Sequence, residues 1–169
     1  MSGDEELLLQ VLNTAPVVDG EPVEQLVGRD GVVLAKRLGG TGSDEELRAL
    51  RGVRDALQHL IAGRDGATAA LQSLLEGVRM TPLFEVDGIR WQLDAPPELA
   101  PAARVAQAWT LVNERRPGRL RPCANEQCNL FLIDRTRPGT AKWCSMSTCG
   151  NRMKARAYAT RQRAAQPSR

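Results

Sequence analysis

Apolar residues recur at the spacing of amphipathic helices through the first eighty residues of the chain. A first helix should stop near residues 13–16. A second should cover residues 23–37 and end at a pair of glycines, and a fourth should cover residues 66–79. The buried faces are expected to be Leu7, Leu8, Val11 and Leu12 in the first helix and Leu71, Leu74, Leu75 and Val78 in the fourth.

The third helix has the clearest start signal in the chain. Ser43 and Glu46 form an S-x-x-E capping box, in which each side chain accepts a hydrogen bond from the other residue's backbone N–H. An apolar face then follows at helical spacing. It consists of Leu47, Leu50, Val53, Leu57, Leu60 and Ile61.

The pattern changes to alternation around residues 83–86 and 89–93, which flank Asp87-Gly88. Such alternation around a two-residue Asp-Gly link predicts a β-hairpin whose two turn positions have positive φ. A further helix is expected over residues 97–114, with Val105, Ala108, Trp109 and Val112 inward. Residues 115–118 should end it. The predicted fold is therefore mainly α, with a helical domain over residues 1–118 that includes a small β-hairpin.

Four cysteines lie within 27 positions, at the spacing C-x4-C-x15-C-x4-C. Two short cysteine-bounded loops joined by a longer link can supply the tetrahedron of thiolates that zinc prefers. Cys123, Cys128, Cys144 and Cys149 are the predicted ligands of one zinc ion. A closed set of four thiolates leaves no open position, so this ion should be structural.

The module around these cysteines, residues 119–169, is too small to fold unaided. Residues 129–135 should form one strand of a short hairpin. Ser145 or Ser147 should cap a helix that carries Cys149 and continues to about Arg163. The loop between Cys123 and Cys128, which we call the knuckle, is followed by a hairpin and by a helix that carries the last ligand. This order is a treble-clef-like arrangement. Zinc binding in such modules contributes about 10–16 kcal/mol of apparent free energy to folding.

The chain begins with an acidic segment, and it contains no apolar run of membrane-spanning length. We therefore expect a cytoplasmic protein that does not enter the membrane, in a reducing compartment where clustered cysteines bind metal before they form disulfides.

The charge of the chain is strongly divided. Residues 1–100 contain 9 Lys+Arg and 17 Asp+Glu, whereas residues 101–169 contain 14 Lys+Arg and 3 Asp+Glu. A basic half of this kind suggests a polyanionic partner such as DNA. Docking of the basic module on the acidic body is the alternative.

Arginines of the last predicted helix fall on one side of it. At 100° per residue, Arg152, Arg156 and Arg163 lie within about 40° of one another, opposite Lys154 and Arg161. Such arginines suit phosphate and guanine. The complete set of candidate nucleic-acid contacts is Arg152, Arg156, Arg163, Arg135, Arg137 and Lys142. Alternatively, Arg152 and Lys142 neutralise the charge of the zinc–thiolate centre, Asn151 caps local backbone and Gly150 permits close packing.

Cys149-Gly150-Asn151-Arg152, with Trp143-Cys144-Ser145 and the first cysteine pair before it, resembles the CGNR zinc-finger family. The preceding hundred residues resemble the ABATE domain that accompanies this finger, at Asn13-Thr14 and at the Arg-x-x-Arg-Asp-Ala-Leu stretch of residues 51–57. The resemblance implies a bacterial transcription regulator described as stress-induced. The segment before Asn13 lacks the aspartate and the aromatic residue associated with that domain, which weakens a ligand-binding role for this segment.

Little in the sequence indicates an enzyme. His59 is the only histidine, and residues 39–43 are glycine-rich but lack the lysine of a phosphate loop. Two functions remain. The first is a transcription regulator whose helical domain binds a small effector or a partner protein while the finger contacts DNA. The second is an interaction adaptor whose finger binds an acidic protein surface.

Overall fold

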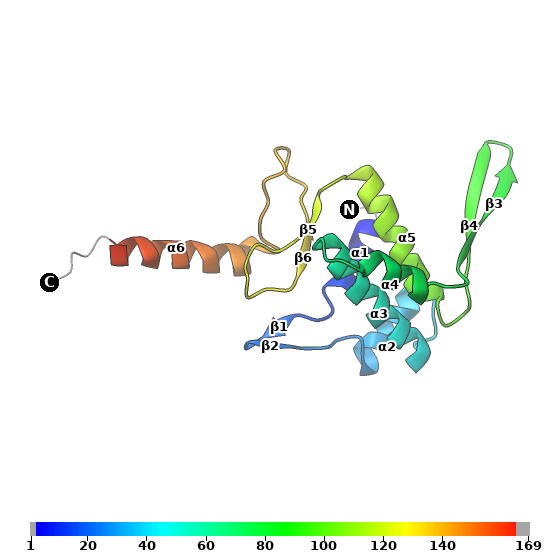
Figure 1. The fold of residues 1–169 in the computed structure, drawn as a ribbon, viewed down its shortest axis with the longest axis horizontal. Helices are drawn as coiled ribbons and strands as arrows, with labels where there is room; N and C mark the ends of the chain where they lie inside the picture. Colours follow the sequence, from blue (N-terminus) through cyan, green and yellow to red (C-terminus); the bar gives the residue numbers. More distant parts are fainter. Residues whose placement is uncertain (1–2, 165–169) are drawn as a thin grey trace.

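The computed structural model describes residues 3–164, which fold into a helical body with a zinc-finger-like module at one end (Figure 1). The elements in chain order are α1 (Gly3–Leu12), β1 (Val17–Val18), β2 (Glu21–Pro22), α2 (Gly28–Arg37), α3 (Asp44–Ile61), α4 (Ala67–Leu74), β3 (Arg79–Glu85), β4 (Gly88–Asp94), α5 (Ala100–Arg115), β5 (Leu120–Pro122), β6 (Phe131–Ile133), the π-helical turn η1 (Met146–Gly150) and α6 (Asn151–Ala164). The predicted fold class is confirmed: helices dominate, and the strands form three separate antiparallel pairs.

The core of the body lies between α1, α3 and α5, which contact one another. Its leucines and valines are almost fully buried, and each such side chain stabilises the fold by about 1.5–3 kcal/mol. Phe131 and Ile133 of β6 belong to the same core although they lie in the C-terminal module. The most deeply buried leucines and valines are Leu8, Val11, Leu12, Leu26, Leu38, Leu50, Val53, Leu57, Val105 and Val112. The core of the body is thus completed by a strand from the cysteine-rich region.

The capping box of α3 is confirmed. The Glu46 N–H donates to Ser43 Oγ at 3.2 Å, and the Ser43 N–H donates to Glu46 Oε2 at 3.3 Å. The same carboxylate also accepts from the backbone N–H groups of Thr41 and Gly42, at 2.9 and 2.6 Å. Burial opposes ionisation of Glu46, but these backbone hydrogen bonds outweigh it and lower the pKa of Glu46. The glycine-rich loop before α3 is therefore wrapped around one carboxylate.

The predicted start of the second helix is wrong. The chain forms the small β1–β2 hairpin, and residues 23–25 stay extended: Val23 N donates to Pro16 O and Gln25 N to Thr14 O, both at 2.8 Å. This pairing fixes the backbone while Leu26 enters the core, so helix α2 begins only at Gly28. Tertiary packing has overridden the local helical pattern here.

The fourth and fifth helices are shorter than predicted. Helix α4 ends at Leu74, because Gly77 adopts a φ of 86° and leads into strand β3. Its leucines and Val78 are half-buried rather than buried. Helix α5 begins at Ala100, after a turn in which Ala100 N donates to Pro96 O at 3.0 Å.

The predicted hairpin is present and longer than expected, but its turn lies one residue earlier in the chain, which shifts each cross-strand pairing by two residues. Glu85 pairs with Gly88, so the two turn residues are Val86 and Asp87. Among the described residues Asp19 is the sole non-glycine residue with positive φ, so Asp87 does not take the expected conformation. The observed register places Phe84 directly opposite Ile89, and a shift of two residues leaves the apolar residues on the same face of the hairpin.

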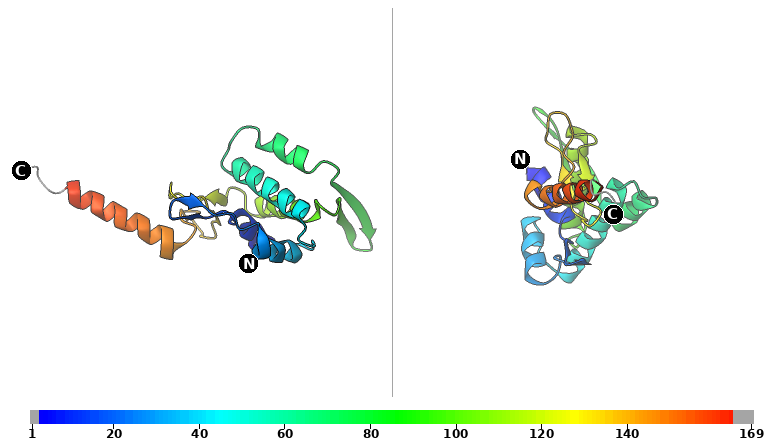
Figure 2. Two further views of the ribbon diagram at one scale, coloured as in Figure 1. Left: turned by 90° about the horizontal axis from the view of Figure 1, so that it is seen from below. Right: turned by 90° about the vertical axis from the view of Figure 1, so that its left-hand side faces the viewer.

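The β3–β4 hairpin and helix α6 project from opposite ends of the body, as the two views with the long axis horizontal show (Figure 1 and the left panel of Figure 2). Within residues 3–164, none of the helices combines the length and apolar character needed to cross a bilayer. The cysteines lie at the root of α6.

Candidate metal centre

Four separate segments bring the cysteines together. Cys123 follows strand β5, and its N–H donates to Leu130 O at 2.8 Å. Cys128 ends a tight turn in which its N–H donates to Asn125 O at 2.7 Å. Cys144 follows a loop, and Cys149 lies in the π-helical turn η1 at the start of α6. Cys123 and Cys149 are buried, whereas Cys128 and Cys144 are half-buried.

The sulfur geometry fits one tetrahedral zinc ion. All four Sγ atoms lie within 4.8 Å of one another. The Sγ atoms of Cys128 and Cys149 each lie 3.7 Å from that of Cys144. Zinc–sulfur bonds of about 2.3 Å in a tetrahedron require sulfur–sulfur distances of about 3.8 Å. A disulfide would require about 2.05 Å, so the set is arranged for a structural metal rather than for oxidation.

The electrostatics of the sulfur cluster favour a cation at its centre. Burial, together with the neighbouring sulfurs, raises the pKa of the Cys128 thiol to about 11 and also raises the pKa of the Cys144 thiol. For Cys149, burial acts in the same direction but is outweighed by hydrogen bonds from Asn125 and the other cysteines, and the pKa is lowered. Sulfurs this close resist full ionisation without a cation, and a divalent zinc ion removes that penalty.

Asn125 is a supporting residue that the sequence analysis missed. It is completely buried, and its Nδ2 donates to Cys149 Sγ at 3.5 Å. The backbone N–H of Cys144 likewise donates to Cys123 Sγ at 3.5 Å. Donors of this kind orient thiolates and reduce their charge, which tunes a metal site. An asparagine two positions after a ligand cysteine is the signal that could have identified it.

Asp134 organises the long loop between the second and third cysteines, and the sequence analysis missed it too. Its buried carboxylate accepts from Thr136 Oγ1 at 2.7 Å, from Ala141 N at 3.0 Å and from Arg121 at 2.8 Å. The hydrogen bond from the Thr136 hydroxyl is the main cause of the lowered pKa of Asp134, and Arg121 adds to it. This carboxylate fixes the path of the loop that delivers Cys144.

The module is tied to the body by two asparagines. Asn13, at the end of α1, accepts from Phe131 N at 2.7 Å and donates to Phe131 O at 3.2 Å. Asn129, from the module, accepts from Val17 N at 3.1 Å and donates to Ala15 O. Each asparagine thus satisfies backbone groups of the other part of the chain.

A cluster of one carboxylate and two arginines also lies at the interface between the body and the C-terminal module. Glu5 on α1 accepts from Arg116 Nε at 2.6 Å and pairs with Arg135 at 3.0 Å. Burial opposes ionisation of Glu5, but the two arginines outweigh it and lower the pKa of this carboxyl group. The sequence left open whether the basic module binds a polyanion or docks on the acidic body. For Arg135 the second alternative applies, because its guanidinium is bound by Glu5 of the body.

The other candidate nucleic-acid contacts lie elsewhere. Arg152, Arg156 and Arg163 are exposed along α6, and Arg156 donates to Gln127 Oε1 at the knuckle. Arg137 and Lys142 are exposed on the loop, and the Lys142 carbonyl accepts from Ala124 N at 2.8 Å. The structure brings these residues to one end of the molecule, but it does not gather them into a single cluster with Arg135.

The start of the last helix differs from the prediction. Ser145 is the N-cap residue, but its side chain makes no capping bond to the backbone; Ser145 Oγ and Ser147 Oγ lie 2.7 Å apart instead. Asn151 Nδ2 donates to Ser147 O at 3.3 Å, as expected for a residue that satisfies local backbone. A Cβ on Gly150 would lie 2.8 Å from Met146 Sδ and 3.3 Å from Trp143, so the backbone at this glycine lies close to both side chains.

These contacts give physical roles to Cys149-Gly150-Asn151: a ligand, a close approach and a backbone cap. No curated protein matches the chain. Residues 119–162, which include all four cysteines, match the family model of the CGNR zinc finger.

Proposed function

We propose that the chain is a zinc-stabilised transcription regulator in which helix α6 contacts DNA and the helical body receives a signal. The observation that carries this proposal is that α6 extends away from the body and is basic and exposed along its length (Figure 2). A helix that is polar on all sides has no apolar face to pack against its own chain, so little of its stability comes from burial. Its exposed surface is therefore free to contact a partner.

The charge of α6 suits a polyanion. Its sequence contains Arg152, Lys154, Arg156, Arg161 and Arg163 and no acidic residue. A helix of about 10–12 Å diameter fits the major groove of B-DNA, which is about 12 Å wide. The zinc site at its root fixes the direction in which the helix points, because Cys149 lies in the turn that leads into it.

Several arginines that precede the cysteine loops already have carboxylate partners. Arg115 pairs with Asp4 at 2.8 Å, Arg116 with Glu5 at 2.6 Å and Arg121 with Asp134 at 2.8 Å. In the part of the chain that the structure describes, the ion pairs do not include any cation of α6. The five cations of α6 are therefore available to an external phosphate, as are exposed cations of the body such as Arg29, Lys36 and Arg64, but those of α6 form the longest run on one element.

A mobility-shift assay with duplex DNA tests the proposal. The double variant Arg156→Ala, Arg163→Ala removes two arginines from one side of α6. Its matched control, Lys154→Ala, Arg161→Ala, removes the same charge from the opposite side. We expect the first variant to bind more weakly and to reduce the slope of log affinity against log salt by about two, one for each lost phosphate contact. Equal affinity of the first variant and the unaltered protein, at equal zinc content, would reject this face of α6.

For the body, we propose an ABATE-like domain that receives an effector or a partner protein. The motif residues of the resemblance meet in one buried network: Arg54 donates to Thr14 Oγ1 at 3.1 Å and pairs with Glu24 at 2.7 Å. The receiving surface would be an apolar hollow of about 740 Å³ between α4, α5 and the hairpin. Thermal-shift screening of metabolites tests the effector, and a screen without any stabilising compound would count against it.

The second candidate is an adaptor whose basic module binds an acidic protein surface. The observation that favours it is the ion pair between Arg135 and Glu5, since an arginine of the module already binds a carboxylate of the body in this way. Salt-dependent retention on DNA would favour the regulator. Co-purification of an acidic protein partner, with no retention on DNA, would favour the adaptor.

A further inference from the structure

The β3–β4 hairpin has one face made entirely of apolar residues. In the observed register three cross-strand pairs share that face. They are Met80–Leu93, Pro82–Trp91 and Phe84–Ile89. The opposite face carries polar and charged pairs such as Arg79–Asp94 and Thr81–Gln92. We refer to the six residues of the three apolar pairs as the apolar ribbon face.

Most of the apolar ribbon face is uncovered. Phe84 is 81% exposed, Trp91 56% and Ile89 52%, and Val86 at the turn is fully exposed. An isolated two-stranded hairpin is marginally stable in water unless such a face is packed against something. The hairpin projects from the body, so within residues 3–164 only its base is supported (Figure 1).

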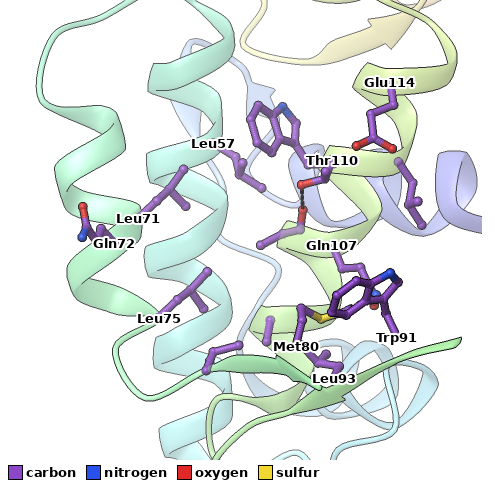
Figure 3. Close-up of a pocket in the computed structure, with 15 residues that line it drawn as sticks. Leu57, Leu71, Gln72, Leu75, Met80, Trp91, Leu93, Gln107, Thr110 and Glu114 are labelled. Atoms are coloured by element: carbon purple, nitrogen blue, oxygen red, sulfur yellow. Dashed lines mark hydrogen bonds between the residues drawn. The ribbon is translucent and has the colours of Figure 1, made fainter. Parts of the chain in front are cut away.

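The base of the apolar ribbon face is continuous with the hollow of about 740 Å³. Figure 3 shows Met80, Trp91 and Leu93 of the hairpin at one side of this hollow, and Leu71 and Leu75 of α4 at another. An apolar protrusion and an apolar hollow therefore lie on the same side of the molecule. A single partner could cover both.

We propose that a second copy of this chain covers the apolar ribbon face. The two hairpins would stack face to face about a two-fold axis with their tips in opposite directions. The tip of each hairpin, Phe84 and Ile89, would then lie over the hollow at the base of the other. A self-complementary patch of this kind is what a two-fold interface requires. The proposed function gives the body a surface that binds an effector or a partner protein, and this inference identifies that partner as a second copy. To that extent it rests on the proposed function.

The charge of the hairpin favours a second copy over other occupants. The apolar ribbon face contains no charged residue, so stacking of the two faces would bury no unpaired charge between the hairpins; Glu114 is the one charged residue among those that line the hollow. Residues 79–94 carry two arginines and three acids, so nucleic acid and anionic membranes are poor partners. A small molecule in the hollow would leave Phe84 and Ile89 in water.

The edge of the hairpin argues for stacking rather than strand addition. Counted from the two-residue turn, Pro82 and Trp91 form a pair that exchanges no backbone hydrogen bonds, so the nitrogen of Pro82 faces the free edge. Proline has no N–H to offer there, which protects the β3 edge against another strand. At their observed exposures Phe84 and Trp91 would alone bury roughly 300 Å² per copy. The rest of the face and the hollow add to this, towards the roughly 800 Å² per partner of a standard interface.

Sedimentation equilibrium of the zinc-loaded full chain, over micromolar to submillimolar concentrations and without DNA, tests the proposal. We expect twice the mass of one chain at the upper end. The variant Phe84→Glu, Ile89→Glu should raise the dissociation constant at least roughly 30-fold, as expected for central interface residues. The control Thr81→Glu, Gln92→Glu adds the same charge as a cross-strand pair on the opposite face, and it should remain a dimer.

Three outcomes would overturn the proposal: a wild-type monomer throughout the range, an apolar-face variant that still dimerises, or equal dissociation of both variants. Circular dichroism of each variant confirms that the body is folded, since the mutated residues lie on the projecting part of the hairpin. The Arg156→Ala, Arg163→Ala variant should dimerise normally. Loss of DNA binding and loss of the dimer are thereby separately measurable.

Discussion

Asn13 and Phe131, 118 positions apart, are joined by two hydrogen bonds between the asparagine side chain and the backbone of the strand residue. The amide of Asn13 thus takes the place of a neighbouring strand at the edge of β6. Asn13→Ala would leave a donor and an acceptor at this junction without partners. We expect a loss of about 1–3 kcal/mol in the free energy of unfolding.

Denaturant unfolding measures that loss. Asn113→Ala, at an exposed asparagine on α5, is the control and should change stability by no more than about 0.5 kcal/mol. Equal effects of the two substitutions would show that the Asn13 contacts do not hold the module on the body.

Removal of zinc should destabilise the body as well as the module. Phe131 and Ile133 are part of the body's core, and their strand is held in place by the cysteine loops on either side of it. We expect chelation to lower the melting temperature of the whole chain in a single transition, with faster hydrogen exchange in α1, which contacts β6. Zinc should restore both. A body that melts at the same temperature with and without zinc would contradict the shared core.

Asn125→Ala should weaken zinc binding without removing a ligand. The substitution deletes the amide donor to Cys149 Sγ and leaves all four sulfurs in place. Loss of such a supporting residue costs about 10–100-fold in metal affinity, which competition with a chromophoric chelator measures. Gln127→Ala, an exposed residue of the same turn, should bind zinc as the unaltered protein does. Unchanged affinity in Asn125→Ala would make Asn125 a packing residue only.

Glu5 should contribute to stability in a pH-dependent manner. The pKa of Glu5 is lowered from its ordinary value of 4.5 because the bonds from Arg116 and Arg135 outweigh the effect of burial. A carboxyl group with a lowered folded-state pKa stabilises the fold above the unfolded value, and this stabilisation is lost as the pH falls through the folded value. The stability difference between the unaltered protein and Glu5→Gln should therefore be largest near neutral pH and shrink below about pH 4.5.

Both proteins release zinc when the pH is lowered. Taking the difference between their free energies of unfolding at each pH cancels this shared effect. Glu98→Gln, at an exposed position before α5, is the control and should change the free energy of unfolding by no more than about 0.5 kcal/mol. A Glu5→Gln difference that stays constant down to pH 3 would mean that the arginines do not hold an ionised carboxylate.

The sequence was sufficient wherever a local rule decided the structure. The capping box fixed the start of α3, and the cysteine spacing identified the metal ligands, because both depend on residues a few positions apart. It failed where distant segments decided. Residues 23–25 have helical periodicity but pair with residues 14–16. The hairpin turns at Val86-Asp87 rather than at the Asp-Gly pair, and the apolar pattern could not predict this because both registers place the same apolar residues on one face. Asp134 was missed because its sequence position gives no pattern by which its burial could be foreseen, whereas the position of Asn125 two residues after Cys123 was a signal that was not used.

The position of Phe131 and Ile133 in the body's core limits how freely this finger can be exchanged. A fragment that began at residue 119 would retain the four ligands but expose two large apolar side chains from β6. Grafting the finger onto another protein would require the recipient to supply an equivalent of α1, with an amide at the position of Asn13. Any exchange of the finger therefore involves β6 and the end of α1 together.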